Sequence, residues 1–146
     1  MSREMGIAIN RLRDHNARAV ALETIPEQIE ALELQYGAIR SATTDSEPVS
    51  GGTNRREDML VDNILKRETL RCNLEIARRE IDVTNKALMA LSADERRILD
   101  LFYINRQNGY IDRLCGELCV ERSRVYTMKD EALRKFCLAI CGTVDL

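Results

Sequence analysis

A run of polar side chains between Glu121 and Asp130 carries the residue types that contact nucleic acids. Arginine, lysine, serine, threonine and tyrosine donate hydrogen bonds to phosphates, and arginine also reaches base edges in a major groove. The candidate contact residues are Arg122, Ser123, Arg124, Tyr126, Thr127 and Lys129. Tyr126 has two equally weighted interpretations, because a tyrosine on a helix either stacks on a base or packs against a neighbouring element.

The apolar residues around this run fall where two helices would pack across a tight turn. Leu114 and Leu118 lie four residues apart on one helical face. Val120 falls in the turn, and Val125 and Met128 lie three residues apart on the next helix. Cys115 is small enough to stand where the helices come close. The stretch from 111 to 130 therefore predicts a helix-turn-helix, with the polar run on its second, recognition helix.

A further helix upstream would complete the core of this motif. Ser92 followed by Glu95 is typical of a capping box, and the helical run should end at Asn108-Gly109. Its apolar positions are Ile98, Leu99, Phe102 and Tyr103. Downstream, the recognition helix should continue inward through Ala132, Leu133 and Phe136. The predicted C-terminal domain covers residues 92–146.

The segments LSADERRILDLFYINR and YIDRLCGELCVERSRVYTMKDEALRKF resemble region 4 of bacterial sigma-70-type factors. The resemblance covers roughly the last third of the chain. The longer layout is similar to the RinA and ArpU type of phage late transcription regulators. These resemblances imply a phage or prophage regulator that binds promoter DNA, with RNA polymerase as a further partner.

Two positions depart from the sigma pattern. Cys119 stands where that pattern usually has glycine, so either the residue adopts a left-handed conformation or the turn differs. Glu121 stands at the usual serine N-cap. It suits the helix dipole but is a poorer cap, and it adds negative charge at the DNA-facing end.

Residues 1–91 read as an extended helical region. With 2 Pro and 7 Gly in 146 residues, and 45% hydrophobic and 32% charged residues, the composition favours an all-α chain. Two heptad-like seams predict a long antiparallel helical pair or coiled coil, with a loop at 41–54 and a kink or restart at Pro26. The first seam is Leu22, Ile25, Ile29, Leu32, Tyr36 and Ile39. The second is Leu60, Ile64, Leu70, Leu74, Ala77, Ile81, Leu88 and Leu91, with polar weak points at Arg67 and Thr84.

This helical region is either a spacer or an element for homodimerisation or polymerase docking. The charge of the C-terminal domain is relevant to this choice. Residues 92–146 hold 9 basic and 9 acidic side chains, although residues 121–135 hold 5 basic and 3 acidic ones. A balanced domain neutralises few phosphates, so it should bind duplex DNA weakly alone and more strongly as a dimer or beside polymerase.

Other site classes find less support. The spacing of Cys115, Cys119, Cys137 and Cys141 could surround a zinc ion, but buried packing is the favoured interpretation, and no cofactor is expected. The single histidine, His15, is expected at the surface. The sequence shows no nucleophile elbow and no glycine-rich phosphate loop, so we do not expect an enzyme. Without a membrane span or signal peptide, we expect a cytoplasmic protein.

Three hypotheses follow. The leading one is a phage-type transcription regulator that binds double-stranded promoter DNA through the helix-turn-helix. The second is a protein-interaction module that docks the same helices on RNA polymerase without touching DNA. The third is a small-terminase-like phage assembly factor that forms a large ring.

Overall fold

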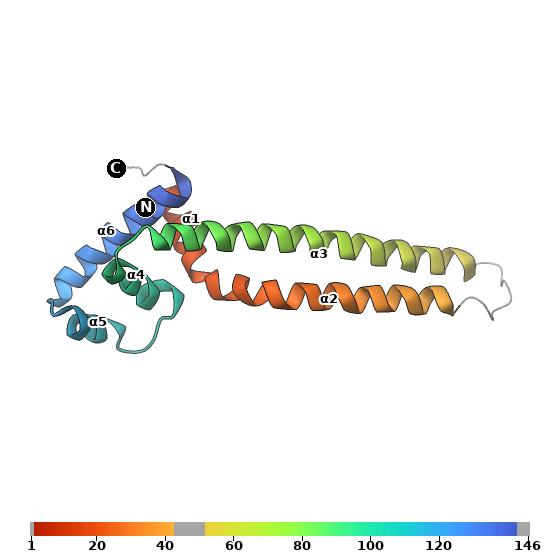
Figure 1. The fold of residues 1–146 in the computed structure, drawn as a ribbon, viewed down its shortest axis with the longest axis horizontal. Helices are drawn as coiled ribbons and strands as arrows, with labels where there is room; N and C mark the ends of the chain where they lie inside the picture. The colour runs from red at the N-terminus through yellow and green to blue at the C-terminus, as the bar shows by residue number, and fades with distance from the viewer. Residues whose placement is uncertain (1, 43–51, 143–146) are drawn as a thin grey trace. The chain divides into compact units, whose positions relative to one another are not determined.

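Helices form all of the regular secondary structure in the described part of the chain. The computed structural model describes residues 2–42 and 52–142. Its elements are α1 (Arg3–Arg13), α2 (His15–Ser41), α3 (Gly52–Met89), α4 (Ala93–Leu99), the π-helical turn η1 (Asp100–Ile104), α5 (Tyr110–Leu118) and α6 (Arg122–Cys141) (Figure 1). These ranges contain no strand, and the all-α prediction is confirmed.

The chain divides into two compact units. One, the terminal unit, combines Met1–Arg18 with Arg79–Leu146, and the other, the hairpin unit, is Ala19–Arg78. The predicted boundary between residues 91 and 92 differs from this division. The reason is that α1 packs against α6, which places the start of the chain in the same core as its C-terminal helices.

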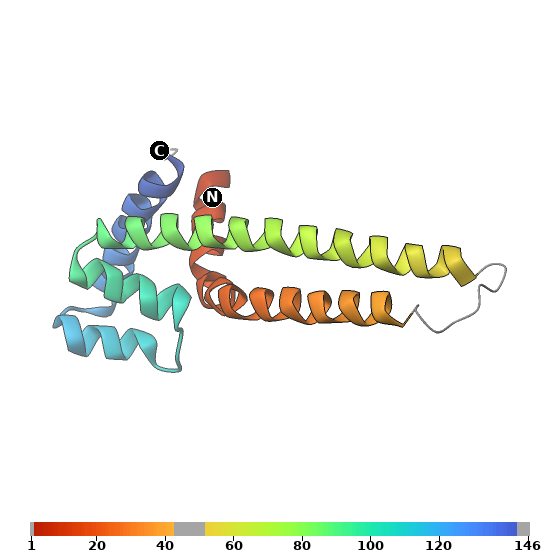
Figure 2. The ribbon, with the colours of Figure 1, turned by 45° about the vertical axis from the view of Figure 1, so that its right-hand side comes forward.

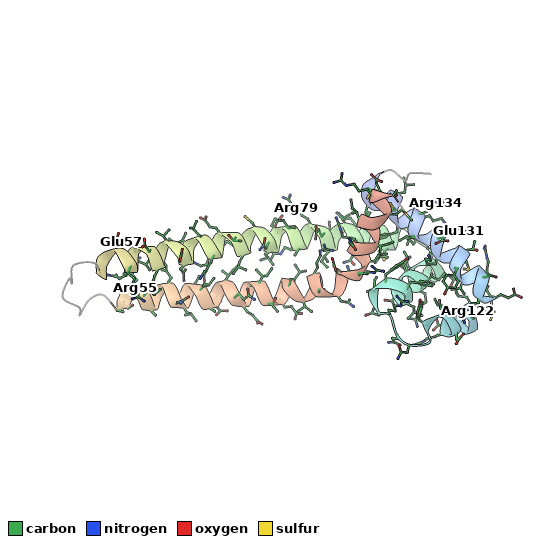
Figure 3. All side chains as sticks on the ribbon, turned by 180° about the vertical axis from the view of Figure 1, so that it is seen from behind. Arg55, Glu57, Arg79, Arg122, Glu131 and Arg134 are labelled. Atoms are coloured by element: carbon green, nitrogen blue, oxygen red, sulfur yellow. The ribbon has the colours of Figure 1, made fainter. Side chains whose placement is uncertain are left out.

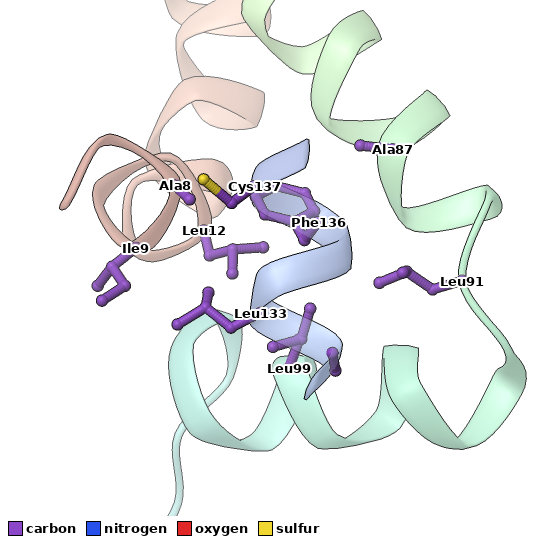
Figure 4. Close-up of a cluster of buried hydrophobic side chains, with 10 residues drawn as sticks. Ala8, Ile9, Leu12, Ala87, Leu91, Leu99, Leu133, Phe136 and Cys137 are labelled. Atoms are coloured by element: carbon purple, nitrogen blue, oxygen red, sulfur yellow. The ribbon is translucent and has the colours of Figure 1, made fainter. Parts of the chain in front are cut away.

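The larger core of the terminal unit joins residues from the two ends of the sequence. Its buried members are Ala8, Ile9, Leu12, Ala87, Leu91, Leu99, Ala132, Leu133, Phe136 and Cys137 (Figure 4). Leu12 of α1 and Phe136 of α6 are both completely buried. Burial of one such side chain stabilises the fold by about 1.5–3 kcal/mol. The predicted inward course of α6 through Ala132, Leu133 and Phe136 is confirmed.

A second core lies between α4, η1, α5 and the start of α6. Its buried members are Ile98, Leu101, Phe102, Ile111, Leu114 and Val125. Cys115, Leu118, Val120 and Met128 pack against it while remaining partly exposed. All five apolar positions predicted around the turn therefore meet in one cluster, together with the small Cys115.

The helix that begins at Ala93 starts as predicted but ends earlier. Ser92 and Glu95 form the capping box, in which the Glu95 backbone N–H donates to Ser92 Oγ over 3.2 Å and the Ser92 N–H to Glu95 Oε1 over 3.1 Å. The helix then widens into η1 and stops at Asn105, whose N–H donates to the Asp100 carbonyl over 2.7 Å. Gly109, predicted as part of the helix end, instead precedes α5 as its N-cap with φ 74°.

In the hairpin unit, α2 and α3 lie side by side and run in opposite directions (Figure 1, Figure 2). The first predicted seam is correct, since its side chains are all buried or half-buried. In the second seam, the prediction for Ile64 is wrong: Ile64 is exposed, and Asn63 occupies the seam with 3% exposure. Asn63 Nδ2 donates to the Leu32 carbonyl over 2.8 Å, so a polar residue can replace an apolar one there.

The two polar residues of the second seam are accommodated differently: Arg67 contacts other side chains, and Thr84 is buried. Arg67 Nε donates to Asn63 Oδ1 over 2.9 Å, and its guanidinium stands 5.0 Å from the centre of the Tyr36 ring. Arg67 therefore pairs with an amide and an aromatic ring of the hairpin unit. Thr84 is buried in the terminal unit at 1% exposure.

Helix α2 continues through Pro26 without a restart. Pro26 is exposed, and the interruption lies earlier, at Asp14 between α1 and α2. Of the predicted loop at 41–54, residues 43–51 lie outside the described residues, while Ser41 ends α2 and Gly52 begins α3. Within the described ranges, every helix is too short or too polar to span a bilayer.

Candidate nucleic-acid interface

The connection between α5 and α6 is a three-residue turn with a left-handed first residue. Cys119 has φ 56° and ψ 45°, and among the described residues it alone has a positive φ without being glycine. Of the two alternatives for this position, the left-handed conformation is therefore the one observed. Its Sγ lies 3.8 Å from the Gly116 carbonyl oxygen, and the Val120 N–H donates to the Cys115 carbonyl over 3.3 Å.

Replacing Cys119 with glycine should stabilise the terminal unit. A side chain in the left-handed region costs about 1–2 kcal/mol, and the extra freedom of glycine in the unfolded chain offsets roughly 0.5–1 kcal/mol of that gain. We expect a net increase of about 0.5–1 kcal/mol, seen in thermal unfolding as a rise of a few degrees in Tm. Cys119→Ala keeps the left-handed Cβ and should give no such rise; equal Tm values for both variants would contradict this explanation.

Helix α6 begins with a weak cap. Glu121 occupies the N-cap position with φ −74° and ψ 160°, and its side chain makes no capping hydrogen bond. This agrees with the poor cap that the sequence predicts. Its charge lies at the positive end of the helix dipole, where it is favourable for folding but unfavourable beside a phosphate.

Five of the six predicted contact residues are exposed on α6. Arg122, Ser123, Arg124, Tyr126 and Thr127 all belong to this group. Figure 3 shows Arg122 at one end of α6 and Glu131 and Arg134 farther along it. Arg124 Nη1 lies 3.9 Å from Glu131 Oε1, and the Thr127 hydroxyl donates to the Ser123 carbonyl over 3.2 Å. Such an exposed ion pair is weak, so Arg124 remains able to exchange it for a phosphate.

The surroundings of Tyr126 are compatible with both interpretations, packing against a neighbouring element and stacking on a base. Its ring meets Phe102 edge-on with centroids 5.9 Å apart, yet 42% of the residue is exposed. The ring also lines a hollow of about 210 Å³ between the starts of α5 and α6. The hollow is lined by Gly109, Tyr110, Ile111, Asp112, Arg122 and Tyr126.

Lys129 differs from the other five. Its side chain is only 19% exposed, its Nζ lies 2.7 Å from Asp130 Oδ1, and it stands 5.7 Å from the centre of the Phe102 ring. Burial works to lower the pKa of Lys129, but the hydrogen bond with Asp130 and the attraction of Tyr103 and Asp130 together outweigh it, and the pKa is raised. These contacts fit a side chain that anchors α6 on the core better than one that reaches outward.

An ion-pair network that sequence spacing did not reveal joins α4 to α5. Arg97 Nε lies 2.9 Å from Glu117 Oε2 and its Nη2 3.0 Å from Glu117 Oε1, which makes the contact bidentate. Arg113 adds a contact of 3.2 Å from its Nε to Glu117 Oε1. The hydrogen bonds from Arg97, followed by its charge and by Arg113, lower the pKa of Glu117 to about 2. Only the Arg113–Glu117 pair, four residues apart, has a local sequence signal.

This network predicts a pH window for stability. Because the folded-state pKa of Glu117 is about 2 and its ordinary value is 4.5, its contribution is complete above pH 4.5 and is lost as the pH falls toward 2. Glu117→Gln should be less stable than the parent at pH 6, and the difference should shrink across that window in chemical denaturation. Glu30→Gln, on an exposed glutamate of α2, should show no such trend. If the difference in free energy of unfolding between the parent and Glu117→Gln stayed constant from pH 6 to pH 2.5, the lowered pKa of Glu117 would be contradicted.

The cysteines do not converge on a metal site. Cys137 is buried in the larger core, Cys115 packs against the second core, and Cys119 is exposed at the turn. Across residues 2–42 and 52–142, no group of three or more His, Cys, Asp or Glu side chains is placed to hold a metal ion. The zinc alternative therefore has no geometry to support it.

His15 is less exposed than predicted. It begins α2 and is half-buried, and its Nδ1 atom is buried without a hydrogen-bond partner. Burial first, and the charge of Arg18 second, lower its pKa. This environment favours a neutral imidazole with a packing role.

Comparison with known proteins places the chain in a family. No curated protein and no solved structure matches it. One family model, described as a protein of unknown function (DUF1492), matches residues 38–136. The matched part runs from the end of α2 to Phe136 on α6 and includes the turn and the exposed residues of the candidate interface. Because the match spans more than half of the 146 residues, the chain belongs to the DUF1492 family.

Proposed function

We propose that this chain binds double-stranded DNA through α5, the turn at Cys119 and α6, and that it acts as a phage-type transcription regulator. The observation that carries the proposal is the placement of Arg122, Ser123, Arg124 and Thr127. These four side chains are exposed on the first two turns of α6, while Val125 between them is completely buried. In helix-turn-helix proteins, the N-terminal part of the second helix enters the major groove and contacts base edges.

Each side chain has a proposed role. Arg122 and Arg124 contact phosphates or the acceptor atoms of guanine, and Ser123 and Thr127 reach phosphates or bases with their hydroxyl groups. Tyr126 lies beside Arg122 at the hollow and stacks on a sugar or base at the edge of the groove. Lys129 holds α6 against Phe102 and contributes its charge at longer range.

The local charge predicts how strongly this surface binds. Glu121, Asp130 and Glu131 lie on the same helix or at its start, and all three are exposed. They offset part of the attraction of Arg122 and Arg124 for phosphates. We therefore propose that one copy binds DNA weakly and that affinity rises with dimerisation or with RNA polymerase bound to the same promoter.

The proposal is tested by titrating a fluorescent duplex of mixed sequence with the full-length protein at 50–200 mM salt. We expect the logarithm of the association constant to fall linearly with the logarithm of the salt concentration. The slope should be close to −0.9 for each phosphate neutralised. Binding to RNA polymerase without salt-sensitive DNA binding would contradict the proposal and favour the docking module. A large ring without DNA binding would also contradict it and favour a phage assembly factor.

A further inference from the structure

One side of the hairpin unit is hollowed between α2 and α3. A groove of about 590 Å³ is lined by Gln28, Leu32, Asp62, Leu65, Lys66, Thr69 and Leu70. A second hollow of about 120 Å³ is lined by Leu32, Gln35, Ile39, Met59, Asp62, Asn63 and Lys66. Leu32, Asp62 and Lys66 line both, so the two hollows are adjacent, and together they are called the groove here.

The groove leaves apolar surface open to solvent. Met59 and Leu65, which line it, are 44% and 55% exposed. The seam residues Leu32 and Leu70 are only half-buried although they face the opposite helix. Two packed helices leave one side of the apolar seam between them open to solvent. In helix bundles, a third or fourth helix covers that side.

Charge differs between the two sides of α2. The α2 residues that line the groove are all uncharged: Gln28 and Gln35 are polar, and Leu32 and Ile39 are apolar. The other side of α2 carries Glu23, Glu30 and Glu33, and Glu33 pairs with Arg71 of α3 over 3.2 Å. Among the residues that line the groove, charge therefore comes only from Asp62 and Lys66 of α3.

The charges that α3 places at the groove complement each other. Asp62 and Lys66 lie four residues apart, and both are exposed. Neither forms an ion pair with another residue in the described part of the chain. When two copies of α3 run in opposite directions about a two-fold axis that passes through the groove midway between Asp62 and Lys66, Asp62 of each copy lies opposite Lys66 of the other. One symmetric contact then pairs both charges twice.

We propose that the groove is covered by the same groove of a second copy, so that two hairpin units form an antiparallel four-helix bundle with Asp62 of one copy paired to Lys66 of the other. The size of the surface fits such an interface. At a rise of about 1.5 Å per residue, the α2 part of the hairpin is about 35 Å long, and two adjacent helices are about 20 Å wide. The face offers roughly 700 Å² per copy, close to the approximately 800 Å² of a standard interface.

This inference does not depend on DNA binding, although it would explain how a domain with balanced charge gains affinity. A dimer would present two α6 helices to DNA, and helix-turn-helix dimers bind two half-sites. Dimerisation is measured without DNA, so a failure of the dimer and a failure of the proposed function give separate results.

The test is a charge exchange followed by sedimentation equilibrium over a range of protein concentrations. Asp62→Lys and Lys66→Asp should each raise the dimer Kd by about tenfold or more, because each variant places like charges opposite each other twice. The double variant Asp62→Lys with Lys66→Asp restores the pairing and should return the Kd to within about threefold of the parent value. Glu68→Lys, on an exposed residue that lines neither hollow, should leave the Kd unchanged.

Circular dichroism of each variant checks that its helices remain formed. A parent protein that is monomeric at every concentration would overturn the inference. It would also be overturned if the single variants dimerise as well as the parent, or if the double variant is as weak as either single one.

Discussion

Replacing Leu12 with alanine is expected to lower the free energy of unfolding of the terminal unit by about 2–5 kcal/mol. Leu12 is completely buried in the core that α1 shares with α6, where Leu133, Phe136 and Cys137 belong to the same cluster. Truncation removes its transfer free energy and leaves a cavity among these side chains. The loss is measured by chemical denaturation and by hydrogen exchange of the α6 amides from Ala132 to Cys137, which should become less protected.

Leu34→Ala is the matched control for this prediction. The leucine lies on α2 and is 71% exposed, so its removal should change the free energy of unfolding by no more than about 0.5 kcal/mol. If Leu12→Ala left the protection of the α6 amides unchanged, α1 would not belong to the C-terminal core. The predicted boundary between residues 91 and 92 would then describe the domains better.

The double variant Arg122→Ala with Arg124→Ala should lower the affinity for duplex DNA by about 30-fold or more. A good contact between an arginine and DNA is worth about 1–3 kcal/mol, and two are removed. If both arginines contact phosphates, the slope of log affinity against log salt should also fall by about two units. Both side chains are exposed on α6, so their removal should leave the stability of the unit nearly unchanged.

Arg134→Ala serves as the control for the arginine pair. Arg134 is also exposed on α6, but it lies twelve residues beyond Arg122, about 18 Å along the helix axis (Figure 3). Its removal should change the affinity by less than about threefold and the salt slope by much less than the double variant. Equal losses for Arg134→Ala and the arginine pair would indicate a general charge effect and contradict the proposed groove contact.

Local spacing predicted the surroundings of the turn because short-range rules decide them. Helical periodicity predicts Leu114, Leu118, Val125 and Met128, and the turn between the helices predicts Val120; all five belong to one cluster or pack against it. The capping box was likewise readable from two residues three apart. The exposure of the candidate contact residues follows from the same periodicity, with Lys129 as the exception. Its contact with Phe102 depends on how α6 packs on η1.

Contacts between distant segments could not be derived in this way. Ala8, Ile9 and Leu12 of α1 meet α6 more than a hundred residues later, and no periodic signal connects the two helices. The bidentate pair between Arg97 and Glu117 spans twenty residues and depends on how α4 and α5 pack. Each of these features is set by tertiary packing.

The seam of α3 shows a different limit. An apolar pattern favours Ile64 over Asn63, but the helix turns Asn63 toward α2, where the Leu32 carbonyl accepts its hydrogen bond. A single buried asparagine of this kind fixes the register of paired helices at some cost in stability. A reading that scores hydrophobic residues alone will misplace such a position by one residue.

Selection of DNA from a random duplex library shows whether α6 reads DNA sequence. The purified full-length protein is incubated with the library, bound duplexes are amplified and sequenced over several rounds, and selected sites are titrated against salt. We expect an enriched motif that the double variant Arg122→Ala with Arg124→Ala no longer selects. If the hairpin units dimerise as inferred, the motif should consist of two half-sites. If the parent protein enriches no motif, either alone or with RNA polymerase present, then α6 does not read DNA sequence.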